Sequence, residues 1–211
     1  LVPVKLIITN YPEGQIEYME VPNNQENEEM GTRMVPFGRE LYIERDDFRI
    51  EPPKKYFRLY PGNEVRLMNA YFVTCTGYET DESGKVTQIY ATYDPETRSG
   101  SGFTGRKVKG TIHWVSAAQA VKAQVRLYEN LVDESAGSVY NDDGSINLNP
   151  NSITILSECY IEPEIEGAEA YDSFQFLRSG FFCVDCRDSK PGALVFNRIC
   201  PLKSSYKPEN K

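Results

Sequence analysis

Basic and aromatic side chains stand side by side in the segment Lys54-Lys-Tyr-Phe-Arg-Leu-Tyr60. Aromatic planes stack on unpaired bases, while Lys and Arg contact phosphates or base edges, so this mixture is typical of single-stranded RNA recognition. A second basic run, Arg106-Lys-Val-Lys109, is expected on a strand with Lys107 and Lys109 on one face and Arg106 on the other. The alternative is an exposed edge strand on which the lysines prevent aggregation with other chains.

The charge of the chain is unevenly distributed. The 211 residues carry a net charge of -8 with a pI near 4.9, which argues against non-specific nucleic-acid binding by the whole surface. Residues 97–128 hold six basic and no acidic side chains, whereas residues 129–172 hold 11 acidic and no basic ones. Two interpretations remain: a positive face for RNA, or chance clustering on solvated strands.

No catalytic residue is expected in this sequence. His113 is its one histidine and lies in an alternating run without a nucleophile motif nearby, so Ser-His or Cys-His catalysis finds no support. The 31 acidic residues make carboxylate pairs plentiful and therefore uninformative about glycosidase chemistry. Walker, dinucleotide-binding and zinc motifs do not occur in the sequence.

The cysteines indicate neither disulfides nor metal. Their number is five, so they cannot all pair, which argues against a disulfide-stapled secreted domain. Cys183 and Cys186 form a CxxC pair, but a metal site would need a second pair or histidines at ligand spacing. We expect no metal site, and buried thiols in a reducing compartment.

The hydrophobic pattern has a period of two and no sustained helical period, which predicts an all-β protein. The candidate strands are Val4–Asn10, Gln15–Val21, Glu40–Ile43, Glu64–Tyr78, Lys85–Asp94, Arg106–Trp114, Ala123–Leu131, Ile153–Ile161, Ser173–Leu177, Gly180–Asp185 and Ala193–Ile199. Short helical turns are expected at Ser116–Ala120 and Asp46–Phe48, and a hairpin turn at Asp81–Gly84. Long polar loops are expected at Pro22–Met30 and Val132–Asn151.

The sequence predicts neither a membrane span nor a secretory leader. Mean hydropathy is -0.51, and no apolar run approaches the ~18 residues that a membrane helix needs. No signal peptide is visible. The chain lacks an initial Met and opens in a strand-like run, so we expect it to be a piece of a longer protein.

Several motifs follow one another along the chain. They are Met30-Gly-Thr-Arg33, Val35-Pro-Phe37, Gly62-Asn-Glu-Val-Arg-Leu-Met-Asn-Ala-Tyr71, Gly105-Arg-Lys-Val-Lys-Gly-Thr-Ile-His-Trp-Val-Ser116, Phe174-Gln-Phe176, Gly180-Phe-Phe-Cys183 and Val195-Phe-Asn-Arg198. Together and in this order, they resemble the anticodon-binding region of the glutaminyl-tRNA synthetase family. The resemblance extends from Val4 to Ser205, and the run from Gly105 is its most specific part.

The resemblance implies an all-β fold of two antiparallel β-barrels, akin to the ribosomal L25 fold. A distal anticodon-binding barrel would cover residues 10–113, and a proximal one would combine residues 1–9 with residues 114–211. It also implies a class I aminoacyl-tRNA synthetase whose catalytic domain lies upstream and uses ATP with Mg. The present chain would then be non-catalytic and hold no cofactor.

The resemblance further implies which residues read the anticodon. Arg58 matches an arginine that reads the third base, and Arg66 matches an arginine at the pocket for the first base. Met68 stands where a second arginine belongs, so the first base must be read differently, by backbone groups or by Lys54 or Lys55. Arginine suits such reading because its planar fork matches the paired acceptors of guanine.

The central base, a uridine, is expected to be read by Gln175, with Arg178 beside it. An amide donates and accepts at once, which matches the carbonyl and imino edge of uridine. Lys203 replaces an arginine and Ser205 a threonine near the same pocket, and both keep charge or hydroxyl.

The implied partners are the anticodon loop of a glutamine tRNA and the upstream catalytic domain of the same protein. We expect a cytoplasmic monomer that binds neither DNA nor a membrane. One alternative is the anticodon-binding domain of an archaeal or eukaryotic type of glutamyl-tRNA synthetase, which shares the two-barrel design. Two remoter ones are a β-sandwich carbohydrate-binding module and an L25-like protein that binds 5S RNA, which would fit one barrel and not two.

Overall fold

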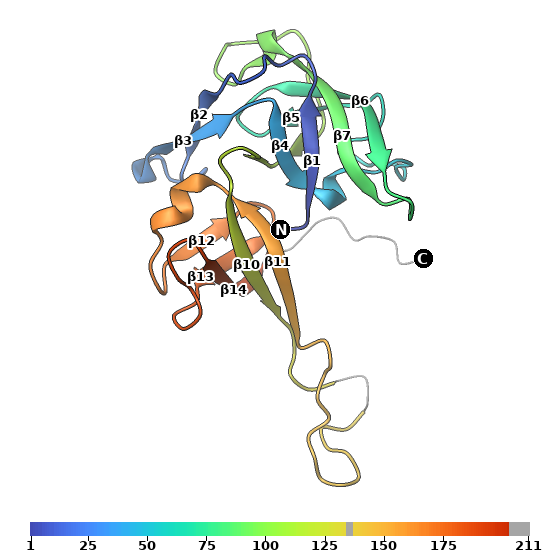
Figure 1. Cartoon of the computed structure of the whole chain (residues 1–211), viewed down its shortest axis with the longest axis vertical. Coiled ribbons are helices and arrows are strands. Elements are labelled where there is room, and N and C mark those ends of the chain that lie inside the picture. Colours follow the sequence, from blue (N-terminus) through green and yellow to red (C-terminus); the bar gives the residue numbers. More distant parts are fainter. Residues whose placement is uncertain (134–136, 203–211) are drawn as a thin grey trace. The chain divides into compact units, whose positions relative to one another are not determined.

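The computed structural model describes residues 1–133 and 137–202 and is all-β, which confirms the predicted fold class. Its strands are β1 (Pro3–Ile8), β2 (Glu17–Pro22), β3 (Thr32–Phe37), β4 (Glu40–Glu44), β5 (Glu64–Leu67), β6 (Phe72–Thr80), β7 (Val86–Asp94), β8 (Thr111–Ile112), β9 (Trp114–Ser116), β10 (Val121–Tyr128), β11 (Ile153–Ile161), β12 (Ser173–Phe176), β13 (Gly180–Val184) and β14 (Leu194–Pro201). Short 3-10 turns are η1 (Glu28–Met30), η2 (Arg45–Asp47), η3 (Pro95–Thr97) and η5 (Pro163–Gly167). Figure 1 traces these elements.

The chain forms two compact units. The larger combines Val2–Val121 with Tyr160–Ile165, and the smaller combines Leu1, the described part of Lys122–Cys159, and the described chain from Glu166 onward. In the larger unit, β1 pairs with β4 and with β7. These bounds are not those expected for the two barrels, residues 10–113 against residues 1–9 with 114–211, and that division stays a prediction.

The larger unit is built around a sheet of seven strands in the order β8-β5-β6-β7-β1-β4-β9. Its two edge strands are consecutive in the chain, with His113 alone between them, so the sheet must curl until its edges nearly meet. Alternate apolar residues of β1 are buried inside this barrel. Phe37 and Trp114 meet edge to face in the core, with ring centroids 5.0 Å apart.

The smaller unit contains a five-stranded sheet in the order β11-β10-β14-β13-β12. Phe182 and Phe196 are fully buried on its inner face, and the ring of Phe176 stacks on Phe182 with centroids 4.4 Å apart. Because side chains alternate along a strand, Gln175 lies on the opposite face from Phe176 and is exposed. The sheet therefore packs one face and presents the other.

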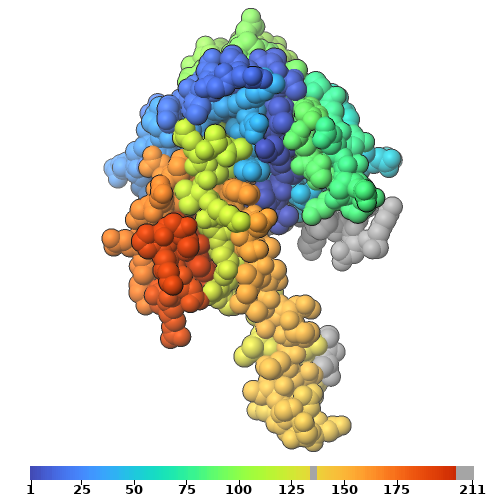
Figure 2. All heavy atoms as spheres, in the orientation of Figure 1, coloured from blue at the N-terminus to red at the C-terminus, as the bar shows by residue number. Residues whose placement is uncertain are grey.

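The long polar loop expected at Val132–Asn151 contains a hydrogen-bonded hairpin that projects beyond β10 and β11 of its own unit (Figures 1 and 2). The backbone N–H of Asp133 donates to the carbonyl of Asn147 at 3.0 Å, and Asn149 donates to Leu131 at 2.8 Å. Cross-strand backbone bonds thus extend the β10–β11 connection as a ribbon.

Local expectations are confirmed in part. The hairpin turn at Asp81–Gly84 is present, since the N–H of Asp81 donates to Lys85 at 3.0 Å and Gly84 has φ +79°. The strand expected over Glu64–Tyr78 is instead two strands, β5 and β6, because the chain reverses where Leu67 donates to the carbonyl of Tyr71 at 2.8 Å.

One further strand, β3, differs from the expectation, while both short turns are present. β3 was not among the expected strands, and it contains Pro36, a residue that is uncommon inside strands. It pairs with β2 in a two-stranded sheet, where Pro36 lies opposite Tyr18 and an edge tolerates the missing N–H. The helical turn expected at Ser116–Ala120 is a single turn, in which the N–H of Ala120 donates to Ser116 at 2.9 Å, and the turn expected near Asp46 is η2.

Candidate nucleic-acid interface

The segment Lys54–Tyr60 lies between η2 and β5, and hydrogen bonds hold it in place at its two buried residues, Tyr56 and Leu59. Tyr56 is 7% exposed, and its hydroxyl donates to the carbonyl of Asp46 at 2.9 Å. Leu59 is fully buried, and its N–H donates to the carbonyl of Asp47 at 2.9 Å. The backbone between these two anchors therefore has little freedom to move.

Phe57 lies between the two anchors and points outward. Half of its surface is exposed, and the Nζ atom of Lys109 lies 5.5 Å from its ring centroid, a cation–π distance. Gly110 lies against the backbone of Phe57, so close that a Cβ atom on residue 110 would lie 2.1 Å from the carbonyl oxygen of Phe57. The structure thus joins the two basic segments that lie about fifty positions apart in the sequence.

Arg58, the predicted reader of the third anticodon base, is oriented by a buried acid. Its Nη1 donates to the side chain of Asp47, which is fully buried. A buried carboxylate needs a cationic or hydrogen-bonding partner, so this pair fixes the arginine. Asn63 adds a hydrogen bond from Nδ2 to the carbonyl of Arg58 at 2.7 Å.

Arg66, the predicted residue of the first-base pocket, lies on β5 with its side chain on the outer face of the barrel. Its Nη1 donates to Ser99 Oγ at 2.9 Å, and its Cζ lies 4.4 Å from the ring centroid of Phe72. Its N–H donates to the carbonyl of Gly110 at 2.8 Å, which ties β5 to the second basic segment.

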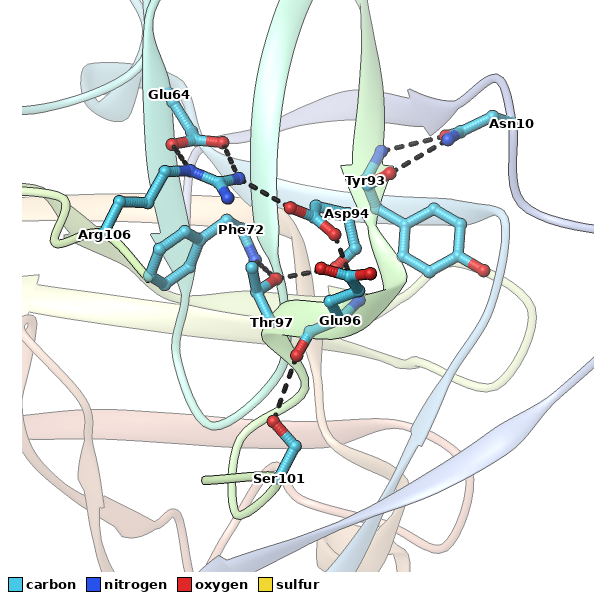
Figure 3. A network of polar contacts seen from close by, with 9 residues as sticks. All are labelled: Asn10, Glu64, Phe72, Tyr93, Asp94, Glu96, Thr97, Ser101 and Arg106. Carbon is cyan, nitrogen blue, oxygen red and sulfur yellow. Dashed lines mark hydrogen bonds and ion pairs between the residues drawn. The ribbon is translucent and has the colours of Figure 1, made fainter. Parts of the chain in front are cut away.

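Arg106 is the most heavily paired cation of this region (Figure 3). Its Nε and Nη2 donate to the two carboxylate oxygens of Glu64 at 2.9 and 2.6 Å, and Nη2 also donates to Asp94 at 2.7 Å. The hydrogen bond from Arg106 holds the pKa of Asp94 below its usual range, although partial burial opposes this. The guanidinium also lies over the rings of Phe72 and Phe103, 5.3 and 5.4 Å from their centroids.

A second set of bonds in Figure 3 secures η3, which carries the chain from β7 into the basic segment. Thr97 Oγ1 accepts from the N–H of Phe72 at 2.8 Å and donates to the carbonyl of Asp94 at 2.7 Å. Ser101 Oγ donates to the carbonyl of Glu96 at 3.1 Å. These bonds fix the position of the carboxylate that Arg106 contacts.

The strand expected over Arg106–Trp114 is wrong for its first half. Residues 98–110 are irregular, and only Thr111–Ile112 and Trp114–Ser116 pair as β8 and β9. The cause is that Arg106 binds two acids outside its own segment and Gly110 packs on Phe57, contacts that a regular strand would not permit. Lys107 and Lys109 are nevertheless both exposed.

The lysines of the two segments differ from the arginines in their pairing. Lys54, Lys55, Lys107 and Lys109 are exposed, and no carboxylate in the described ranges 1–133 and 137–202 forms a salt bridge with them. Arg58 and Arg106 in the same region are paired with acids, whereas Arg66 contacts Ser99 and the ring of Phe72. Much of the positive charge that remains available to a polyanion therefore comes from the lysines.

Gln175 and Arg178, predicted at the central base, belong to the smaller unit. Gln175 lies opposite Phe181 in the β12–β13 register, and Phe181 is 40% exposed. Arg178 is exposed in the turn that follows β12 and has a positive φ of 65°. An amide edge and a flat apolar ring thus stand side by side on one sheet face, a pairing suited to contact with a base.

The predicted site residues accordingly fall into two groups. Lys54, Lys55, Arg58 and Arg66 lie in the larger unit, and Gln175 and Arg178 lie in the smaller one. Lys203 and Ser205 lie outside the described residues. Phe57, Asp47, Glu64 and Gly110 were not predicted as site residues, because their roles depend on contacts between distant segments.

His113 has a structural partner. Its Nε2 lies 3.4 Å from Glu162 Oε1, and Arg33 donates to both oxygens of that carboxylate, from Nε at 2.6 Å and Nη2 at 3.0 Å. Burial alone would raise the pKa of Glu162, but the hydrogen bonds from His113 and Arg33 lower it to about 2. The cluster connects Glu162, in the stretch Tyr160–Ile165, to Arg33 and His113 of the same larger unit.

Other site types find no support in the described part of the chain. No group of three His, Cys, Asp or Glu residues there could hold a metal ion. All five cysteines are free, but the expectation of buried thiols holds only for Cys75 and Cys159, because Cys183 is half-buried and Cys186 and Cys200 are exposed. None of the described helical segments is long and apolar enough to cross a membrane.

Comparison with known families gives the class of protein that this fold and these segments define. Residues 1–94 and residues 111–185 match two families, each described as tRNA synthetases class I (E and Q), anti-codon binding domain. The chain belongs to this family of anticodon-binding domains, which confirms the resemblance inferred from the motifs.

The relatives are more specific. The chain is 55% identical over 211 residues to glutamine–tRNA ligase of Clostridioides difficile (strain 630), covering 98% of this chain and 37% of the relative. It is 54% identical over 209 residues to glutamine–tRNA ligase of Clostridium perfringens, covering 97% of this chain and 37% of the relative. It is 51% identical over 205 residues to glutamine–tRNA ligase of Bordetella pertussis, covering 97% of this chain and 35% of the relative. The chain therefore spans little more than a third of the length of these relatives.

Proposed function

We propose that the chain binds the anticodon loop of a glutamine tRNA, as the anticodon-binding part of a glutamine–tRNA ligase. The observation that carries this proposal is a set of exposed lysines without salt bridges in the two basic segments that meet at Phe57 and Lys109, in a chain whose net charge is -8. An acidic protein that keeps a local cluster of uncompensated lysines beside an exposed aromatic ring is suited to a single-stranded polyanion with bases. The glutamine ligases among its relatives favour glutamine over glutamate.

The roles of individual residues are part of the proposal. Arg58 would read the third base and Arg66 the first, with Lys54 or Lys55 assisting at the pocket where Met68 stands. Gln175 would read the central uridine with Arg178 beside it, and Lys203 and Ser205 would act near the same pocket. The salt bridge with Asp47 orients the side chain of Arg58 before RNA binds, so little side-chain freedom is lost on binding. This supports a role in reading a base over a contact by a mobile charge.

The remaining proposals concern the whole protein. Ligation of glutamine to tRNA would be performed by a catalytic domain outside this chain, which would bind ATP with Mg, and the present chain would contribute no catalytic group. The partners would be the tRNA and that domain, without DNA or membrane. We propose a monomer in the cytoplasm.

Binding of anticodon stem-loop RNA to the chain, followed by fluorescence anisotropy, tests the function. Affinity should fall steeply with salt, with a log–log slope of about 0.7 per phosphate contact of a single strand. A loop with the glutamine anticodon should bind more tightly than one with a glutamate anticodon. The matched variants are Lys109→Gln and, as control, Lys122→Gln in the smaller unit, which removes the same charge elsewhere. Salt-independent binding, or equal affinity for every anticodon, would contradict the proposal.

A further inference from the structure

We infer that Phe57 is a stacking surface for one unpaired base of the bound RNA, with the ammonium of Lys109, 5.5 Å from the ring centroid, as the neighbouring cation. This inference rests on the proposed function and assigns a role to a residue to which the comparisons give none. Three features carry it: the exposure of the ring, the rigidity of its backbone and the distribution of charge around it.

The exposure of Phe57 is unusual for its surroundings. The ring is 50% exposed, whereas Tyr56 on one side is 7% exposed and Leu59 beyond Arg58 is fully buried. A large apolar ring that is half exposed to water at the centre of a charged segment buries little of its apolar surface in the folded chain, and it offers a flat surface to a ligand. Nucleic-acid bases are the ligands that use such a surface most directly, since every base has a π-face.

The rigidity of the segment makes Phe57 a prepared surface. The backbone on either side is held by the bonds of Tyr56 to Asp46 and of Leu59 to Asp47, each 2.9 Å. Gly110 lies against the Phe57 carbonyl, in a space that no side chain could share. An aromatic side chain on such a backbone loses only its own two torsions on binding, so the entropic cost of stacking is small.

The charge around Phe57 selects the chemistry of the ligand. Lys109 lies 5.5 Å from the ring centroid, and Lys54 and Lys55 are exposed in the same segment. No salt bridge neutralises these lysines in residues 1–133 and 137–202. A neutral apolar partner would have to desolvate these ammonium groups without replacing their hydration, whereas the phosphates that flank an unpaired base would pair with them.

The test uses Phe57→Trp as a reporter. The wild-type chain has one tryptophan, Trp114, which is 3% exposed and provides a constant background. Stacking of a base on the new indole should quench its fluorescence when glutamine anticodon stem-loop RNA is added. The same loop carrying an abasic site at one anticodon position at a time should lose the quenching for one position only, which identifies the stacked base.

Affinities provide the second readout. Phe57→Leu keeps an apolar side chain beside Lys109 but removes the π-face, and we expect about tenfold or greater weakening of binding. Phe57→Tyr should restore the affinity. Tyr18→Leu is the matched control, because Tyr18 is 49% exposed in the same unit, and it should bind as the wild type does.

The outcomes separate this inference from the proposed function. Tight, anticodon-dependent binding together with an unquenched Phe57→Trp and an unaffected Phe57→Leu would overturn the stacking role and leave the proposed function standing. It would also point to a protein surface as the ligand of Phe57. A wild-type chain that binds no anticodon RNA would overturn both.

Discussion

Arg106 and Glu64 form a bidentate ion pair in which Nε and Nη2 of the guanidinium donate to the two carboxylate oxygens at 2.9 and 2.6 Å. Glu64 lies on β5, two residues from Arg66, so the pair attaches the irregular segment of residues 98–110 to the strand that carries a predicted anticodon contact. Arg106 is thereby a positioning residue, since acids already occupy its guanidinium, while Lys107 and Lys109 remain exposed.

Arg106→Gln should loosen this attachment more than it lowers overall stability. The side chain of Arg106 is 41% exposed, so the loss in free energy of unfolding should be about 1 kcal/mol or less. Limited trypsin digestion should cleave faster after Lys107 and Lys109, because the segment opens locally. Lys122→Gln removes a surface pair with Glu158 in the smaller unit and should leave those cleavage rates unchanged. Equal protection in Arg106→Gln would show that the pair does not position the segment.

Gly110→Ala should damage both the fold and the interface. The new Cβ would lie 2.1 Å from the carbonyl oxygen of Phe57, which is backbone and cannot rotate away. We expect a loss of about 1–3 kcal/mol of stability and weaker RNA binding, because the strain shifts Phe57 and Lys109 apart. Gly167→Ala is the control, since nothing lies within 4 Å of its Cβ position. Thermal melting and anisotropy measure the two effects, and an unshifted melting temperature would refute the predicted contact.

Gln175→Ala should flatten discrimination between uridine and cytidine at the central anticodon position. The loss for the cognate base should be about 1–3 kcal/mol, the usual size of a good base-edge contact. Lys107→Ala should instead weaken binding of all anticodon variants alike, because a phosphate contact carries no sequence information. Affinities for stem-loops that differ only at the central base, with melting temperatures measured alongside, decide between the two roles. A uniform loss in Gln175→Ala would assign the amide to the fold alone.

Glu162 should make the larger unit acid-sensitive. Its pKa in the folded chain is lowered from 4.5 to about 2, so the carboxylate contributes stability above pH 4.5 that is lost as the pH falls toward 2. The shift corresponds to about 3 kcal/mol, and Glu162→Gln should abolish this part of the acid dependence. Glu166→Gln, an exposed residue of η5, is the control. Urea unfolding between pH 2 and 6 measures the profile, and parallel curves for wild type and Glu162→Gln would contradict the prediction.

The class of fold and most strands could be predicted from local sequence, because a period of two with β-branched and aromatic residues has one common structural outcome. Ile153–Ile161 was predicted with the bounds that β11 has. The prediction of a strand over Arg106–Trp114 was wrong for its first half. The alternating pattern of this segment is compatible with a strand, but the segment is held by contacts with Glu64, Asp94 and Phe57, which are distant in the sequence. Local strand propensity does not include the effect of such contacts between distant residues.

The sequence by itself determined the kinds of side chain available for RNA and, through its motifs, the family that uses them. Tertiary structure decided which of those side chains are occupied. Arg58 and Arg106 look equivalent to Lys54 and Lys109 as charges in the sequence, yet the arginines are paired with acids and the lysines are exposed. Ion pairing depends on distances of a few ångström between residues that are far apart in the chain, and the folding of the nearly closed barrel brings Glu64, Asp94 and Arg106 within that range.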